Sequence, residues 1–187
     1  AKGRTQEIER LVARSLRAAV DLEELGPIAL NVDCDILNAD GGTRCASITA
    51  ANLALRLGVR RLISSGICLP KDMRPTEEQR RSGWSAPVLS KEEQLAHEMR
   101  VMPHDVAAIS VGLIDGASYL DLDYNLDSNA DVDMNVVKVS SGAFVEVQGT
   151  GEESTYEREE LDALLDMADI GFSSLFEMQK TILHGQE

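Results

Sequence analysis

The chain has 187 residues, of which 43% are hydrophobic, so it can form one domain with a sizeable core. Its 32 acidic and 18 basic residues give a formal net charge of −14, which excludes a surface that binds nucleic acid everywhere but leaves room for a local basic pocket. We expect no membrane span, because no stretch approaches about 18 consecutive apolar residues. We also expect no signal peptide, because the charged start AKGRTQEIER lacks an apolar core. The cysteines Cys34, Cys45 and Cys68 form no CxxC pair and indicate reduced thiols and a cytoplasmic location.

The first segments predict a helix followed by a strand. Apolar residues recur at helical spacing over residues 8–20, Thr5 is a plausible N-cap, and Gly26-Pro27 is a stop signal. In the next segment, IALNVDCDIL, apolar side chains alternate with mostly polar ones over residues 28–36, and Cys34 falls on the inward side. This alternation predicts a half-buried strand.

A second helix is expected from about Thr43 to Leu57, where Gly58 would end it. Residues 59–104 contain most of the prolines and the only tryptophan. We interpret them as a surface excursion rather than core, with a short helix near Lys91 to Arg100.

The remaining segments predict an antiparallel meander and a terminal helix. Asp115-Gly116 and Ser141-Gly142 are turn signals between strands. Leucine, alanine and phenylalanine side chains then form one helical stripe from Leu161 to Ile182, with Gly171 as a candidate kink. The order of elements predicts an α+β fold in which helices pack on a mixed sheet. The expected strands are VAAISVGLID and residues 118–124, 132–139 and 143–148.

The stretch DGGTRCASIT joins the predicted strand to the second helix. Gly41 and Gly42 permit a tight or left-handed backbone, and the first amides of a helix have no partners within the helix. Thr43 adds a hydroxyl donor and Arg44 a planar cationic donor group, so the turn contains the parts of a phosphate site. Arg4 is a second cation at a helix start. The alternative is a purely structural turn in which Arg44 pairs with a nearby acid.

The stretch DLDYNLDSNADVDMN contains five aspartates. It is not an EF-hand, because Leu126 replaces the required glycine and Val132 the required glutamate. In a continuous strand Asp127 and Asp133 would lie ~20 Å apart at ~3.3 Å per residue. If the chain turns at residues 128–130, the two carboxylates can share Mg²⁺ or Mn²⁺ together with water and a substrate phosphate. The alternative is a polar turn with a solvated face.

These two stretches resemble RNase PH, the bacterial-type phosphorolytic exoribonuclease that is related to polynucleotide phosphorylase and the exosome ring subunits. The resemblance extends in family order over GRTQEIERLVARSLRAAVDLEELG, NVDCDILNADGGTRCASITA, VAAISVG, DLDYNLDSNADVDMNVV and FVEVQGTGEE. It implies the β-α fold of that family, which is related to the ribosomal-protein-like βαβ superfamily.

The resemblance also implies a reaction. Inorganic phosphate, as co-substrate, attacks the last phosphodiester at an RNA 3′ end and releases a nucleoside diphosphate. By position, the residues that match the family's phosphate-binding motif are Arg4, Gly42, Thr43 and Arg44. Those that match its catalytic, metal-binding pair are Asp127 and Asp133.

Two departures from the family pattern affect these expectations. The family's N-terminal strands have no counterpart before GRTQEIER, so residues 1–187 are expected to form one partial RNase PH-like domain. A separate chain is one possible source of those strands. The excursion over residues 59–104 is longer than the usual family connection and is interpreted as an insertion.

We therefore expect an exoribonuclease of the tRNA nucleotidyltransferase type that trims RNA 3′ ends, precursor tRNA above all, within a hexameric ring. One alternative is a truncated or inactive relative that serves as a structural subunit of an RNA-processing or ribonucleoprotein assembly. The other is a plain phosphate- or nucleotide-binding module.

Overall fold

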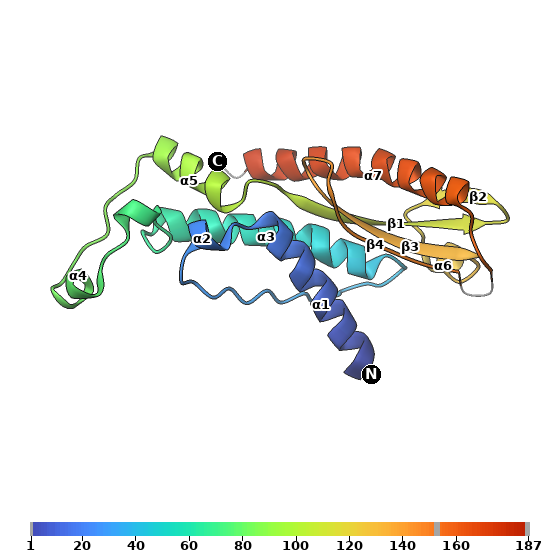
Figure 1. The fold of residues 1–187 in the computed structure, drawn as a ribbon, viewed down its shortest axis with the longest axis horizontal. Helices are drawn as coiled ribbons and strands as arrows, with labels where there is room; N and C mark the ends of the chain where they lie inside the picture. Colours follow the sequence, from blue (N-terminus) through green and yellow to red (C-terminus); the bar gives the residue numbers. More distant parts are fainter. Residues whose placement is uncertain (1, 152–153, 186–187) are drawn as a thin grey trace.

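Helices cover both faces of a four-stranded sheet in the computed structural model, which describes residues 2–151 and 154–185 (Figure 1). The strand order is β2-β1-β3-β4, and all pairings are antiparallel in the described part of the chain. The elements are α1 (Lys2–Ala19), α2 (Leu22–Leu25), α3 (Thr43–Ser64), the 3₁₀ turn η1 (Lys71–Met73), α4 (Glu77–Arg81), α5 (Lys91–Val101), β1 (Val106–Ile114), β2 (Ala117–Leu120), α6 (Tyr124–Asp127), β3 (Val132–Val139), β4 (Phe144–Gly151) and α7 (Arg158–His184).

The two faces of the sheet have separate cores because neighbouring residues of a strand point to opposite sides. On one face, alternate residues of β1 and β3 such as Ile109 and Met134 pack against α7. On the other, residues such as Ala108 and Val137 pack against α1 and α3. The α+β class predicted from the sequence is therefore confirmed.

The face beneath α1 and α3 is apolar at one end and polar at the other. Val137 and Val139 of β3 belong to the core, whereas Asp133 and Asn135 of the same strand lie at the polar end. The cross-strand partners of Asn135 are Ser110 on β1 and Gln148 on β4, so a polar row crosses three strands. This row lies in the part of the sheet that the candidate site uses.

The strand predicted over residues 28–36 is wrong. This segment runs unpaired between α2 and α3 (Figure 1). Most of its side chains, including Cys34, are exposed. A strand requires a neighbour for its backbone hydrogen bonds, and no described strand lies beside this one. The expected mixed sheet is wrong as well, because residues 28–36 do not join the sheet and its four described strands pair only antiparallel.

The second helix is longer than predicted. Gly58 does not end it, and α3 continues to Ser64 because Val59 and Ile63 add buried apolar side chains. The excursion also contributes to the core through Cys68, Leu89 and other residues, contrary to its interpretation as surface connection. The helix predicted near Lys91 is confirmed as α5.

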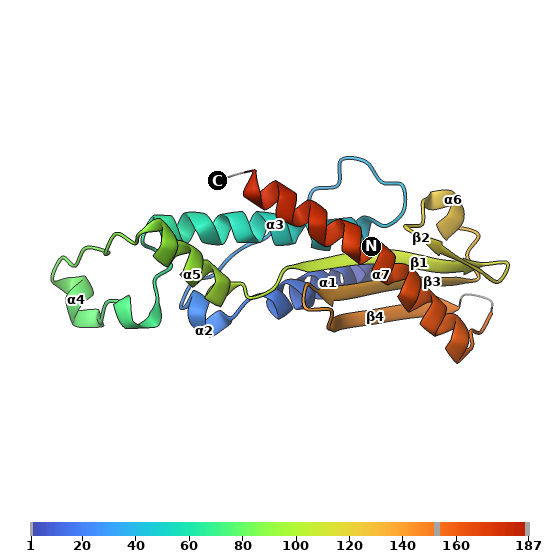
Figure 2. The same cartoon turned by 90° about the horizontal axis from the view of Figure 1, so that it is seen from above.

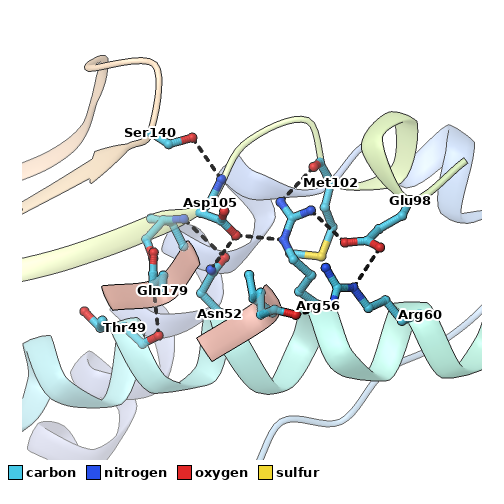
Figure 3. A network of polar contacts seen from close by, with 11 residues as sticks. Thr49, Asn52, Arg56, Arg60, Glu98, Met102, Asp105, Ser140 and Gln179 are labelled. Carbon is cyan, nitrogen blue, oxygen red and sulfur yellow. Dashed lines mark hydrogen bonds and ion pairs between the residues drawn. The ribbon is translucent and has the colours of Figure 1, made fainter. Parts of the chain in front are cut away.

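Polar side chains fix α5 to the C-terminal half of α3 (Figure 3). The buried Arg56 guanidinium contacts Glu98 at 3.0 Å, Asp105 at 2.8 Å and the carbonyl of Met102 at 2.9 Å. Arg60 contacts the second carboxylate oxygen of Glu98 at 2.8 Å. The segment that carries α4 extends from this end of the molecule, beyond the sheet (Figure 2).

Other predictions hold with small changes. β3 matches its prediction over residues 132–139, and Asp115-Gly116 forms the expected turn with φ values of 51° and 74°. Thr5 is not an N-cap, because α1 already begins at Lys2. Gly171 lies within the continuous α7, where a Cβ would come 2.2 Å from Ile109 Cδ1, so it serves close packing. Within the described residues, no helix combines the length and apolar character that a membrane crossing needs.

Candidate functional site

The glycine turn at the start of α3 has the backbone expected of an anion site. Gly41 and Gly42 are both left-handed, with φ values of 77° and 56°, and α3 begins at the next residue, Thr43. Gly42 is the N-cap and has no side chain to bond the first helix amides. Residues 41–44 are half-buried and therefore accessible. The turn can present helix amides, the Thr43 hydroxyl and the positive end of the helix dipole to an anion.

The turn packs tightly against the loop that leads into α6. A Cβ on Gly41 would lie 2.3 Å from the carbonyl oxygen of Leu122, so only glycine fits here. The backbone amide of Tyr124 donates to Asp40 Oδ1 at 3.2 Å. These contacts fix the glycine turn relative to α6, whose last residue is Asp127.

The chain reverses between the two predicted metal ligands. Asp123 caps α6 by accepting the amide of Leu126 at 2.8 Å, and Asp127 ends that helix with an exposed side chain. A turn follows, and Asp133 is the second residue of β3 and half-buried. The reversal required by the metal-site prediction is therefore present. Asp131 has a structural part, since its carboxylate accepts the amide of Asp115 at 2.9 Å.

Arg44 lies in a network that joins α1, α3 and β4. Its Nη2 contacts Glu7 Oε2 at 3.4 Å, and Gln148 Nε2 donates to Glu7 Oε1 at 3.4 Å. The Arg44 side chain remains 26% exposed. Arg4 is exposed on α1 one turn before Glu7, and residues three apart share a helix face. Both predicted arginines thus lie on the side of the molecule that carries the glycine turn.

Cys45 connects the helix start with the strand of Asp133. Its thiol donates to Asn135 Oδ1 at 3.1 Å, and both side chains are buried. Burial, followed by the nearby charges of Asp133 and Asp121, raises the pKa of the Cys45 thiol to about 12, against a smaller opposing effect of Arg44. The thiol therefore stays protonated at neutral pH and is unsuited to be a nucleophile.

The contacts around the glycine turn include residues to which the sequence analysis gave no role. Asp121, with a left-handed φ of 57°, lies beside the turn, since its Oδ1 would be 3.7 Å from a Cβ on Gly42. Glu7, Asn135 and Gln148 also enter the site. The alternation of polar and apolar residues in β3 is the signal that could have assigned Asn135 to the face of Asp133.

The acidic residues form no complete metal cage. The described part of the chain contains no group of three or more His, Cys, Asp or Glu side chains placed to hold a metal ion. A pair of carboxylates on α6 and β3 suits Mg²⁺ or Mn²⁺, which keep several waters and complete their coordination with substrate phosphate. The donor chemistry fits such an ion and does not fit a structural zinc.

An apolar groove of about 790 Å³ leads to the glycine turn. It lies between α1, α3 and the unpaired segment 28–36, and Thr43 and Arg44 are at its border. The alternating side chains of the segment contribute to its lining, so the residues predicted to be one buried strand face line a groove instead.

Comparisons with known proteins agree with the resemblance of these motifs. A model described as "3′ exoribonuclease family, domain 1" matches residues 1–58, and the model for domain 2 of the same family matches residues 104–171. A protein named Ribonuclease PH from Corynebacterium efficiens is 48% identical over 182 residues, which are 97% of this chain and 62% of the relative. Ribonuclease PH from a Synechococcus species is 44% identical over 178 residues, 95% of this chain and 60% of the relative. The chain thus spans about three fifths of the length of these relatives.

Solved structures show the same fold at low sequence identity. Rrp46 from rice (Oryza sativa) superposes with a TM-score of 0.59 at 14% identity, covering 97% of this chain and 66% of that one. A chain of an archaeal exosome core gives a TM-score of 0.52 at 17% identity, covering 89% of this chain and 60% of that one. At these identities the likeness concerns the fold alone.

Proposed function

Since this chain belongs to the 3′ exoribonuclease family of ribonuclease PH, we propose that it is the catalytic part of a phosphate-dependent 3′→5′ exoribonuclease. In the proposed reaction, an oxygen of inorganic phosphate bonds to the phosphorus of the last RNA linkage. The bond from that phosphorus to the 3′ oxygen of the preceding nucleotide breaks. The products are a nucleoside diphosphate and an RNA shorter by one nucleotide.

The glycine turn is assigned to the attacking phosphate. In this assignment the first amides of α3, the Thr43 hydroxyl and the Arg44 guanidinium bind its oxygens, and Arg4 of α1 adds a second cation. The positive charge offsets the repulsion between phosphate and the RNA backbone. Because phosphate is a reactant, this turn must orient it as well as bind it.

Asp127 and Asp133 are assigned to a divalent metal, Mg²⁺ or Mn²⁺. When bound, such an ion stabilises the negative charge that develops on the scissile phosphate and the leaving oxygen. The residues themselves supply two carboxylates from separate elements, α6 and β3. The packing of Gly41 against the carbonyl oxygen of Leu122, in the loop that leads into α6, supports this assignment.

The observation that carries the proposal is the left-handed Gly41-Gly42 turn, packed against the loop that leads to Asp127. The test is to incubate the protein with an oligoribonucleotide and Mg²⁺ at several phosphate concentrations. We expect nucleoside diphosphates to accumulate only when phosphate is present. Release of nucleoside monophosphates without phosphate would contradict the assignment.

Two conservative variants test the metal ligands. Asp127→Asn and Asp133→Asn keep the size of each side chain and remove its charge. Each should lower the rate of diphosphate release on the order of 10²-fold or more. Asp131→Asn is the matched control, because Asp131 bonds the amide of Asp115. Full activity in Asp127→Asn would show that the ion is held elsewhere.

The finer assignments follow from the same family. We propose precursor tRNA as the substrate, a cytoplasmic location and assembly into a hexameric ring. The groove beside segment 28–36 would receive extended polypeptide with alternating apolar side chains, either from the same protein or from a separate chain. The unpaired backbone of the segment supports this idea, since an added strand would complete its hydrogen bonds.

We also propose that residues 59–104 are an insertion within one RNase PH-like domain; the two family matches leave residues 59–103 between them. A structural subunit without turnover is the second candidate function, and the exposed segment 28–36 favours it. The phosphate-dependence assay separates the two, because a structural subunit would release no diphosphates at any phosphate concentration.

A further inference from the structure

We propose that the hydrogen bond from Cys45 to Asn135 is a positioning contact that fixes the phosphate-binding turn relative to the strand of Asp133. The inference rests on the proposed function and adds two residues to it. Cys45 follows Arg44 directly, in the first turn of α3. Asn135 lies two residues after Asp133 on the same face of β3. The contact therefore joins the residue that follows a proposed phosphate ligand to a residue on the same strand face as a proposed metal ligand.

Within the polar row, the contact with Cys45 is the one that reaches α3. Asn135 is the centre of the polar row that crosses β1, β3 and β4, and each member of the row holds a different element. Ser110 Oγ accepts the amide of Leu122 at 3.1 Å and so holds the loop before α6. Gln148 bonds Glu7 of α1, which contacts Arg44. Asn135 is the member that reaches α3, through Cys45.

The nearby carboxylates explain why an uncharged pair, Cys45 and Asn135, is suited to this position. Asp121 and Asp133 lie close enough to Cys45 for their charges to act on its thiol. A further carboxylate here would repel phosphate, and a further cation would compete for the carboxylate of Asp133. A thiol donating to an amide oxygen gives a directional contact without adding charge.

Loss of the contact should affect geometry more than folding. Replacing Cys45 by valine leaves a side chain of similar size without a donor, so α3 can shift by a fraction of an ångström relative to β3. Misplacement of about 1 Å between reacting groups can cost on the order of 10²-fold in rate. We expect Cys45→Val to raise the KM for phosphate about tenfold, whereas Cys45→Ser, which keeps a donor, should stay within about twofold of the original protein.

A double-mutant cycle tests whether Cys45 acts through Asn135. Asn135→Leu should raise the KM for phosphate as Cys45→Val does, and the double variant should be no worse than Asn135→Leu alone. Additive effects, or an unchanged KM in Cys45→Val, would overturn the inference. The matched control is Cys68→Val, which removes a buried thiol that lies 3.6 Å from the carbonyl of Leu25, outside the site. It should lower the melting temperature without changing the KM.

Failure of the proposed function is distinguishable from failure of the inference. If the original protein releases no nucleoside diphosphates at any phosphate concentration, the proposed function fails. The variants are then judged by calorimetric binding of inorganic phosphate in the presence of Mn²⁺. Weaker binding by Cys45→Val, with recovery in Cys45→Ser, would support the positioning contact, and equal binding by all variants would reject it.

Discussion

The two ends of α3 use arginine in opposite ways. Near its N-terminus, Arg44 contacts Glu7 at 3.4 Å and its side chain is 26% exposed. In its C-terminal half, the Arg56 side chain is 5% exposed and makes three contacts of 2.8–3.0 Å (Figure 3). A buried guanidinium that bonds through all three of its nitrogens holds elements together, whereas a loosely held and accessible one can bind a ligand.

The polar residues between the ends follow the same division. Asn52 bonds Asp105 at 2.9 Å and the amide of Val106 at 3.2 Å, so it joins α3 to the start of β1. Cys45, seven residues earlier, instead bonds Asn135, which lies two residues after the candidate metal ligand Asp133 on β3. One helix thus joins other elements through buried polar contacts at one end and carries a candidate site at the other. Mutations at the first end should change the free energy of unfolding, and mutations at the second should change the kinetics with phosphate.

The largest effect is expected at the structural end. Arg56→Met removes the charge but keeps a long side chain, and it leaves Glu98 and Asp105 without their buried partner. Breaking a buried ion pair in this way costs about 3–5 kcal/mol. Urea denaturation should show this loss, while the KM for phosphate of the folded protein should not change.

Arg61→Met is the control for that variant. Arg61 lies on the same helix but is exposed. Its replacement should change the free energy of unfolding by less than about 0.5 kcal/mol. Similar losses in both variants would show that helix propensity, rather than the buried network, determines the result.

The next effect is expected at the candidate site. Arg44→Lys keeps the charge but removes the planar pair of donors that suits phosphate oxygens. We expect kcat/KM for phosphate to fall about 10²-fold, with little change in the free energy of unfolding because Arg44 is partly exposed. Steady-state assays at varied phosphate concentration measure the first quantity and urea denaturation the second. A large loss of stability with unchanged kinetics would show that Arg44, like Arg56, has a structural role.

A smaller effect is expected for the glycine turn. Gly41→Ala places a methyl group 2.3 Å from the carbonyl oxygen of Leu122 at a left-handed φ of 77°. Gly116→Ala is the matched control, because φ is 74° there and nothing lies within 4 Å of a Cβ. The control should lose about 1 kcal/mol from backbone strain alone, and Gly41→Ala roughly 2 kcal/mol together with a higher KM for phosphate. Equal losses, measured by urea denaturation, would mean that the loop simply moves aside.

Local sequence patterns predicted most of the elements and the chain path at the site. Helical spacing, turn residues and alternation located α5, β3 and the reversal between Asp127 and Asp133. These features depend on nearby residues. The glycine turn could likewise be recognised because left-handed backbone and a following helix leave a local signature.

Predictions that depended on distant partners failed. The alternation over residues 28–36 predicted a strand, but a strand exists only beside another strand, and this segment lines a groove. Gly58 did not end α3, because residues beyond it have distant partners: Val59 and Ile63 are buried in the core, and Arg60 contacts Glu98 and Leu183. Glu7, Asn135 and Gln148 enter the site through contacts between elements that are distant in the sequence.

The smallest expected effect concerns pH at the structural end. His97 of α5 is fully buried beside Cys68, with Nε2 3.6 Å from the thiol, while Nδ1 lies 3.8 Å from Glu24 and 3.4 Å from Arg100. Burial, and then the charge of Arg100, lowers the pKa of His97 below its ordinary value, against the opposing effect of Glu24. The folded protein thus favours neutral His97.

The sign of the pH dependence follows from that direction. Between the folded pKa and the unfolded value of about 6.5, the unfolded chain binds more protons, so His97 costs stability as the pH falls through this window. Above about 6.5 both states are neutral and the cost vanishes. His97→Gln should remove this contribution, which the difference between the two unfolding curves over pH 5–8 would measure. Because His97 lies at the structural end, the KM for phosphate should follow pH in the same way in both proteins. A flat difference in stability, or a changed KM profile, would show that the two ends of α3 are not separate.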